Sequence, residues 1–253
     1  MKGIDLTGKT ALVTGGNIGI GRAAALALAE CGADVAVTYF AHDGTDTQAT
    51  IERLGRKGIA TKLDATASAE VNRTVAALAE QLGGHIDILF NNAGGLVGRA
   101  PLAEMSDDLF ARVFAVNVTS AFYVTRATLA FMDRGWGRII FNGSVAGHHG
   151  GGNGAAAYAA TKGAIHTLTR GLAKEVASQG ITVNAVAPGF IVDTPFHATF
   201  TAPDAQDASI AQTALKRAGE HSDLAGAIIY LASDLAAYLT GEIIEINGGS
   251  WFV

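Results

Sequence analysis

Tyr158 and Lys162 are the two side chains whose types and spacing point most directly to chemistry. They stand four positions apart in an Ala-rich segment that is expected to be helical, so both lie on one helix face. A neutral phenol has a reference pKa of about 10 and is a poor acid–base catalyst at pH 7, but a nearby ammonium favours the phenolate. The pair therefore predicts a proton-transfer centre in which Lys162 lowers the pKa of Tyr158.

The elements that must position this pair follow from an alternation of short apolar runs and longer helical patterns. This order predicts βαβ units and a doubly wound, mostly parallel, seven-stranded α/β sheet with helices on both faces. The expected strands cover residues 10–14, 34–39, 59–63, 86–90, 138–142, 181–186 and 242–246. The expected helices cover residues 20–31, 45–57, 67–82, 106–133, 155–178 and 221–232. We expect residues 1–253 to form one domain, in which the irregular stretch 190–215 is a lid over the ligand site.

A glycine-rich turn joins the first expected strand to the first expected helix. It reads Thr-Gly-x-x-x-Gly-x-Gly from Thr14, with glycines at Gly15, Gly19 and Gly21 and a further one at Gly16. Glycines here permit a tight turn, let the backbone approach a pyrophosphate and let the helix pack closely on the strand. The turn therefore predicts a dinucleotide-binding site.

The composition excludes several other classes of protein. The 253 residues carry a net charge of −5, without the basic surplus that nucleic-acid binding needs. The single cysteine, Cys31, excludes an internal disulfide and fits a reducing compartment. The chain shows neither a signal-peptide core nor a stretch of about 18 uncharged apolar residues. We expect a soluble, cytoplasmic protein that binds neither nucleic acid nor a membrane and holds no metal.

Taken in order, the glycine turn, the acid–base pair and four further motifs resemble the short-chain dehydrogenase/reductase family over essentially the whole chain. The further motifs are Asn91-Asn92-Ala93-Gly94, Asn117 within the long helix, Ser144 after the fifth strand, and Pro188-Gly189 after the sixth. The resemblance implies a Rossmann-type fold and hydride transfer between a nicotinamide dinucleotide and a small-molecule carbonyl or alcohol. It also implies a homotetramer that pairs the two longest helices and the last strands.

The resemblance implies a role for each matching residue. Tyr158 would be the general acid and base, Ser144 would bind the substrate oxygen, and Asn117 would hold a proton-relay water near Lys162. Asp64 would bind the adenine amino group or cap the helix that follows it. The full set of implied cofactor-binding residues is Gly15, Asn17, Ile18, Gly19, Ile20, Gly21, Tyr39, Asp64, Ala65, Asn91, Ala93, Gly94, Tyr158, Lys162, Pro188, Gly189, Ile191 and Thr194.

Two departures from the family pattern affect these roles. The family's threonine would fall at position 193, where this chain has Asp193, so either Thr194 or the backbone near Ile191 would contact the carboxamide. NAD-selective relatives place an acid at the end of the second strand, where this chain has Tyr39. The missing acid removes a repulsion against a 2′-phosphate, although no arginine replaces it. We therefore favour NADP(H), with NAD(H) as the alternative.

The loops around the reacting centre bear on the substrate. Residues 91–99, 146–152 and 193–198 resemble those of reductases from sugar-acid and uronate catabolism. One extra residue within Gly150–Gly152 leaves room for a polar substrate, and Arg99 could bind a carboxylate. The implied substrate residues are Arg99, His149, Gly150, Gly151 and His197.

Two alternatives remain open at this point. A 3-oxoacyl-acyl-carrier-protein reductase would need a basic patch for its acidic carrier, for which Arg126, Arg134 and Arg138 are the candidates. A non-catalytic dinucleotide sensor is the other alternative. The intact set of Ser144, Tyr158 and Lys162 favours an enzyme over a sensor.

Overall fold

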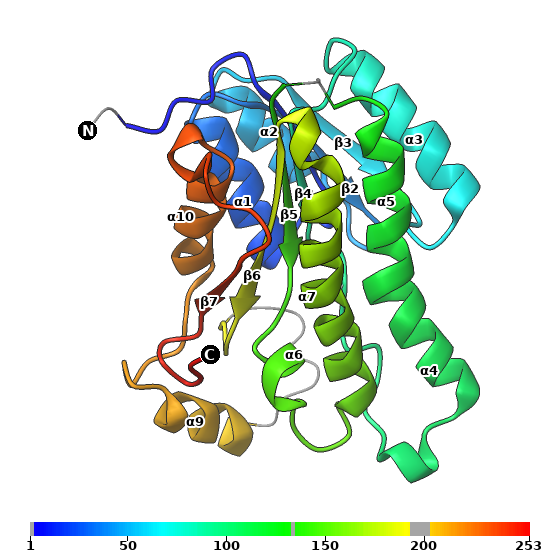
Figure 1. Cartoon of the computed structure of the whole chain (residues 1–253), viewed down its shortest axis with the longest axis vertical. Helices are drawn as coiled ribbons and strands as arrows, with labels where there is room; N and C mark the ends of the chain where they lie inside the picture. Colours follow the sequence, from blue (N-terminus) through cyan, green and yellow to red (C-terminus); the bar gives the residue numbers. More distant parts are fainter. Residues whose placement is uncertain (1–2, 133–134, 193–202) are drawn as a thin grey trace.

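The computed structural model describes residues 3–132, 135–192 and 203–253, and its centre is a seven-stranded sheet (Figure 1). The strand order is β3-β2-β1-β4-β5-β6-β7, and every neighbouring pair is parallel. The strands are β1 (Thr10–Val13), β2 (Asp34–Tyr39), β3 (Gly58–Lys62), β4 (Ile88–Asn91), β5 (Gly137–Asn142), β6 (Ile181–Pro188) and β7 (Ile243–Ile246). The predicted doubly wound α/β fold is confirmed.

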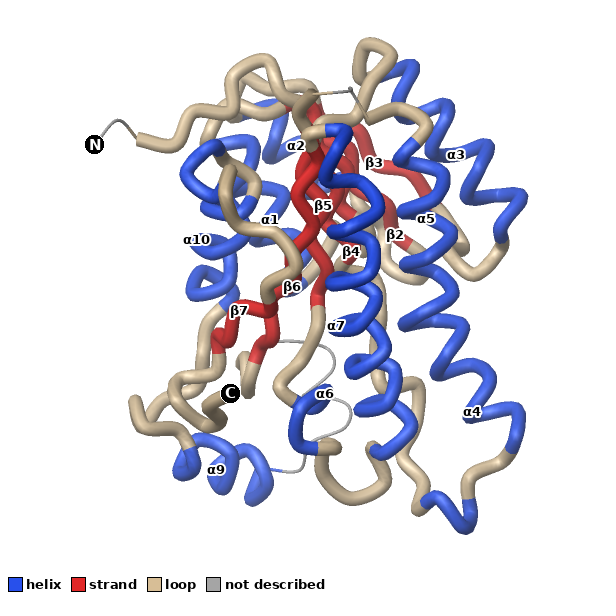
Figure 2. Tube along the Cα trace, in the orientation of Figure 1, coloured by secondary structure: helices blue, strands red, loops and turns tan. Residues whose placement is uncertain are grey.

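Helices cover both faces of this sheet. One layer holds α1, α2 and α10, and the other holds α3, α5 and α7, with the strands between them (Figure 2). The helices are α1 (Gly19–Glu30), α2 (Thr45–Arg53), α3 (Ser68–Gln81), α4 (Asp107–Phe114), α5 (Ser120–Leu129), α6 (Ala146–His149), α7 (Ala156–Val176), α9 (Pro203–Gln212) and α10 (His221–Leu231). In the described part of the chain, none of them combines the length and the apolarity needed to cross a membrane.

Side chains along the strands alternate between two separate apolar cores. In β5, Ile139 and Phe141 face the core formed with α3, α5 and α7, whereas Ile140 faces the core formed with α1 and α10. Both faces of the sheet are therefore buried, which explains why its strands read as nearly continuous apolar runs in the sequence.

The predicted helix over residues 106–133 is divided in the structure. A π-helical turn at Ala115–Thr119 separates α4 from α5. Two further helices, α6 and α9, form where the sequence predicted none. With four residues α6 is too short to show helical periodicity, and the apolar residues of α9 do not gather on one side.

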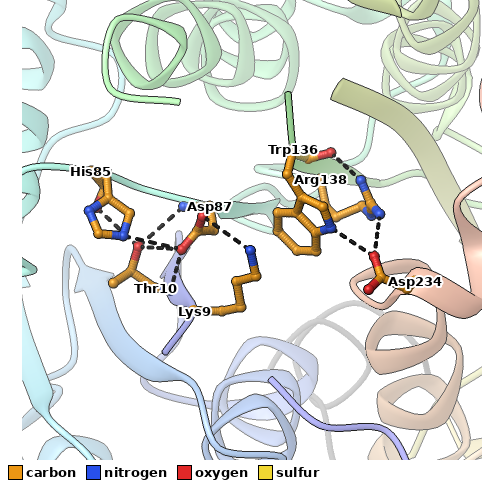
Figure 3. A network of polar contacts seen from close by, with 8 residues as sticks. Lys9, Thr10, His85, Asp87, Trp136, Arg138 and Asp234 are labelled. Atoms are coloured by element: carbon orange, nitrogen blue, oxygen red, sulfur yellow. Dashed lines mark hydrogen bonds and ion pairs between the residues drawn. The ribbon is translucent and has the colours of Figure 1, made fainter. Parts of the chain in front are cut away.

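The amino-terminal ends of β1, β4 and β5 are held by buried polar side chains (Figure 3). Asp87 accepts hydrogen bonds from the Thr10 N–H at 2.8 Å and from the Thr10 hydroxyl at 3.2 Å. The buried guanidinium of Arg138 donates to Asp234 at 3.1 Å, and the Trp136 indole donates to the same carboxylate at 2.7 Å. These contacts stabilise the edge of the sheet opposite the carboxyl ends of the strands.

Asp87→Ala tests how much this edge contributes to stability. The substitution leaves the buried Thr10 N–H without its acceptor, so we expect the free energy of unfolding to fall by about 2 kcal/mol in urea titrations. Asp46→Ala is the control, because its exposed ion pair with Arg22 should be worth less than about 1 kcal/mol. Equal losses in the two variants would contradict the assignment.

Candidate active site

The carboxyl ends of the strands open onto one large cavity. Its volume is about 1150 Å³, and its lining includes residues that follow β1, β2, β3, β4, β5 and β6. The chain leaves β1 toward β2 on one side and returns to β4 on the other. The cavity therefore lies where the strand order reverses, which is where ligands bind in open parallel sheets.

A chain of hydrogen bonds crosses the strand ends beneath this cavity. The Lys162 ammonium on α7 donates to the carbonyl oxygen of Asn142 at 2.6 Å, and Asn142 Nδ2 donates to Asn92 Oδ1 at 3.0 Å. Asn92 Nδ2 then donates to the carbonyl oxygens of Thr14 and Gly15, both at 3.0 Å. These contacts connect α7 to β5, β4 and the glycine turn in one continuous chain.

Tyr158 and Ser144 meet at the edge of the cavity. Both residues line it, and their hydroxyls are hydrogen-bonded to each other. Burial raises the pKa of Tyr158 to about 12, and the hydrogen bond to Ser144 only partly opposes that effect. Burial also lowers the pKa of Lys162 to about 8.

The prediction that Lys162 lowers the pKa of Tyr158 is therefore wrong for the chain on its own. The ammonium lies 5.6 Å from the centre of the phenol ring and donates to a main-chain carbonyl instead. Desolvation outweighs the attraction at that distance. Tyr158 is consequently a protonated hydrogen-bond donor at neutral pH.

Asn117 lies at the π-helical turn between α4 and α5. Its Nδ2 donates to the carbonyl oxygens of Gly95 at 2.7 Å and Val113 at 2.9 Å, and its Oδ1 accepts from the Gly95 N–H at 3.0 Å. A Cβ added at Gly94 would come within 2.7 Å of that Oδ1. Asn117 thus braces the loop after β4 from behind, without lining the cavity itself. Its water-holding role stays a prediction.

The glycine turn offers a site for an anion. Gly15 has a φ of 61° and Gly19 a φ of 55°, a left-handed conformation that favours glycine. Both residues line the cavity, together with Asn17 and Ile18. Among the described side chains none caps the start of α1, so the first amides of this helix are available to a pyrophosphate.

Two predicted cofactor residues lie away from the cavity. Gly21 packs under the turn, because a Cβ there would come within 2.1 Å of the Gly15 carbonyl oxygen. Asn91 points to the opposite side of β4 and donates to the Thr125 hydroxyl at 2.9 Å. Its neighbour Asn92 lines the cavity instead, since successive side chains of a strand face opposite ways.

Most other predicted residues line the cavity, namely Ile20, Tyr39, Asp64, Ala65, Ala93, Gly94, Pro188, Gly189, Ile191, Arg99, His149 and Gly151. Gly150 does not; it ends α6 with a φ of 88°. The alternative prediction that Asp64 caps the next helix is wrong, because its carboxylate accepts from the Thr66 N–H at 2.9 Å and α3 has its N-cap at Ala67. Thr194 and His197 lie outside the described residues. The described part of the predicted lid reaches the cavity through Ala205 and Ser209 of α9.

The two described arginines of the predicted basic patch, Arg126 and Arg138, do not form a surface patch. Arg138 is buried at the opposite edge of the sheet, where it pairs with Asp234. Arg134 lies outside the described residues. Arg126 is exposed and stacks its guanidinium over Phe122, 4.9 Å from the ring centre.

Sequence reasoning missed the structural roles of Thr14, Asn92 and Asn142. The Thr14 hydroxyl accepts from the N–H groups of Asn92 and Ala93, both at 3.0 Å, and so joins the end of β1 to the loop after β4. Each of these polar residues lies at or just beyond the end of an apolar strand. That position is a usable signal, because the ends of parallel strands meet at one edge.

Comparison with known proteins agrees with this geometry. Residues 15–250 match the family described as Enoyl-(Acyl carrier protein) reductase. The 3-oxoacyl-[acyl-carrier-protein] reductase FabG of Escherichia coli (strain K12) is 40% identical over 251 residues, which cover 99% of this chain and 100% of the relative.

Two solved structures illustrate the likeness in three dimensions. A short chain dehydrogenase from Burkholderia cenocepacia in complex with NADP has a TM-score of 0.90 and 35% identity, covering 97% of this chain and 98% of its own. A putative gluconate dehydrogenase from Agrobacterium tumefaciens has a TM-score of 0.92 and 35% identity, covering 99% and 98%. The chain belongs to the short-chain dehydrogenase/reductase family of oxidoreductases.

Proposed function

We propose that this chain reduces a carbonyl compound with NADPH and that Tyr158 gives the proton to the carbonyl oxygen. The observation that carries the proposal is the hydrogen-bonded pair of Tyr158 and Ser144 at the cavity. Because burial raises the pKa of Tyr158 to about 12, its hydroxyl keeps the proton that reduction requires. A positioned general acid contributes about 10²- to 10⁴-fold in rate.

Ser144 and Tyr158 would bind the same carbonyl oxygen. The Ala146 N–H donates to Ser144 Oγ at 3.1 Å, which holds the Ser144 oxygen in place beside Tyr158. Negative charge gathers on the substrate oxygen during reduction, and transfer of the Tyr158 proton leaves a phenolate. Lys162 is the cation placed to stabilise that phenolate in its buried setting.

The glycine turn and Lys162 would hold the nucleotide. Bound NADPH supplies the hydride for the reduction. The free amides at the start of α1 would bind its pyrophosphate, and Lys162 would bind the ribose hydroxyls. These residues fit a dinucleotide, because Gly15 and Gly19 take left-handed conformations at the cavity and have no side chains to cover the backbone amides.

The end of β2 supports NADP(H) over NAD(H). The cavity there is lined by Tyr39, Phe40, Ala41 and His42, so no carboxylate in this set repels a 2′-phosphate. Asp43 instead binds the N–H of Thr45 at 3.1 Å. The Burkholderia cenocepacia structure in complex with NADP supports the same choice.

We infer that the substrate is a 3-oxoacyl thioester. Relatives named 3-oxoacyl-[acyl-carrier-protein] reductase match the chain from end to end, as the Escherichia coli enzyme does. Apolar residues also line the cavity and would pack against an acyl chain, namely Val97, Val145 and Phe190. The structure describes two of the arginines predicted to contact an acidic carrier protein. Arg138 is buried and Arg126 is exposed, so Arg126 is the one that a carrier protein would contact.

A sugar-acid substrate is the second candidate, and Arg99 is the observation that favours it. Arg99 lines the cavity and donates to the Asn153 carbonyl oxygen at 2.9 Å, which holds the guanidinium beside the glycine loop. A guanidinium in that place suits a carboxylate. The putative gluconate dehydrogenase from Agrobacterium tumefaciens supports this candidate.

Substrate assays on wild type and Arg99→Ala decide between the two classes. We expect NADPH oxidation with acetoacetyl-CoA, and a change in kcat/KM of less than about threefold in Arg99→Ala, because the reacting 3-oxo group and its thioester carry no carboxylate for a guanidinium to bind. Turnover of keto-gluconates or keto-uronates, with a loss of at least about tenfold in Arg99→Ala, would instead establish the sugar-acid candidate. Arg73→Ala is the control for a general charge effect, since Arg73 is exposed on α3 and lies outside the cavity lining.

Tyr158→Phe tests the proton donor. The variant keeps the ring and loses only the hydroxyl, so kcat should fall by at least about 10²-fold while the Kd for NADPH changes little. Tyr238→Phe, at a fully exposed tyrosine, should behave as wild type. Full activity in Tyr158→Phe would exclude the mechanism.

Lys162→Met tests the cost of the buried ammonium. The folded pKa of about 8 is below the ordinary 10.5, so the unfolded chain binds this proton more tightly and the charge destabilises the fold below pH 8. We expect Lys162→Met to raise the free energy of unfolding at pH 7 by about 1–3 kcal/mol while activity falls. The gain should shrink as the pH rises from about 8 to 10.5. Lys174→Met, an exposed lysine on the same helix, should show no such pH-dependent gain.

A further inference from the structure

A cluster of polar side chains lies behind the catalytic helix and has no part in the proposed reaction. His148 Nε2 of α6 lies 2.8 Å from Glu245 Oε1 of β7, and each side chain is 16% exposed. The ring of His166, from α7, stacks on His148 with their centres 4.5 Å apart. Two consecutive helices and a strand from much further along the chain therefore meet through these three side chains.

The cluster is tightly enclosed. His166 is 3% exposed, and burial together with the nearby cations lowers its pKa to about 4, so it is neutral. A Cβ at Gly143 or Gly147 would come within 2.6 Å or 2.8 Å of the His166 ring. The backbone of the segment around Ser144 thus rests directly on His166, one helical turn beyond Lys162.

The contact of His148 with Glu245 joins α6 to β7. Just before α6, the Gly143 N–H donates to the Val186 carbonyl oxygen at 2.8 Å and the Val145 N–H donates to that of Pro188 at 3.0 Å, which ties the segment around Ser144 to β6. Glu245 stands on β7 beside β6, so His148 adds a side-chain contact from α6 itself to the same part of the sheet.

The next residue, His149, turns the other way. It lines the active-site cavity and packs edge-on against Trp251, with ring centres 5.6 Å apart. Asn247 Nδ2 donates to Glu245 Oε2 at 3.2 Å and to the Trp251 carbonyl oxygen at 2.9 Å. Glu245 therefore contacts α6 directly through His148. Through Asn247 it is also linked to Trp251, the residue against which His149 packs.

We propose that His148 and Glu245 are positioning residues that hold α6 so that Ser144 and His149 face the reacting carbonyl. This inference rests on the proposed carbonyl reductase activity. It predicts an effect on the carbonyl substrate and not on NADPH, because the glycine turn is held by the separate contacts of Asn92 and Thr14.

Glu245→Gln is the test, with Glu242→Gln as the control at an exposed position in the same segment. In Glu245→Gln we expect the KM for acetoacetyl-CoA to rise about 5- to 20-fold, with kcat and the Kd for NADPH within about threefold of wild type. Glu242→Gln should match wild type in all three quantities. A Glu245→Gln variant with an unchanged KM would overturn the proposal.

Hydrogen exchange of the amides of residues 146–150 gives a readout that needs no turnover. It should be faster in Glu245→Gln than in wild type and unchanged in Glu242→Gln. If wild type reduces no carbonyl compound but this difference appears, the proposed function fails and the anchoring of α6 stands. Equal exchange in Glu245→Gln and wild type would remove the anchor and with it the proposal.

Discussion

The hydrogen bond from the Lys162 ammonium to the Asn142 carbonyl oxygen is the contact on which the rest of the site depends. It joins the middle of α7 to the last residue of β5 and is made by a side chain that is 5% exposed. A buried ammonium needs an acceptor, and a main-chain carbonyl at a strand end is one that cannot swing away. Tyr158 lies one turn earlier on α7, and Ser144 lies two residues after Asn142. This contact therefore links the segments that carry the two hydroxyls.

The two halves of the cavity are built differently. The nucleotide half is crossed by amide and hydroxyl side chains of Asn142, Asn92 and Thr14, which tie one strand end to the next. The substrate half is made of the short helix α6 and a glycine loop in which Gly150 and Gly151 take left-handed conformations.

The sequence predicted the strands to within one or two residues, because strands buried on both faces appear as continuous apolar runs. It did not predict which of the neighbouring residues Asn91 and Asn92 points its amide side chain into the cavity, because that depends on which way each side chain of β4 faces. The direction of the Tyr158 pKa shift was wrong because the degree of burial is a property of the folded chain. The ion pair of His148 and Glu245 joins positions almost a hundred residues apart, so no local pattern could indicate it.

The π-helical turn at Ala115–Thr119 has a consequence for how this chain can change in length. Such a turn holds one residue more than the α-helical turn it replaces, and here the extra residue lets Asn117 reach Gly95. Deleting one residue inside the turn would restore a regular helix and keep the phase of α5, at the cost of the reach of Asn117. Deleting one residue from α4 would instead rotate all of α5 by about 100° relative to α4. Ala121 and Val124 would then leave the core, and the exposed guanidinium of Arg126 would turn toward it. Changes of length are consequently far more acceptable inside this turn than in the α-helical segments on either side of it.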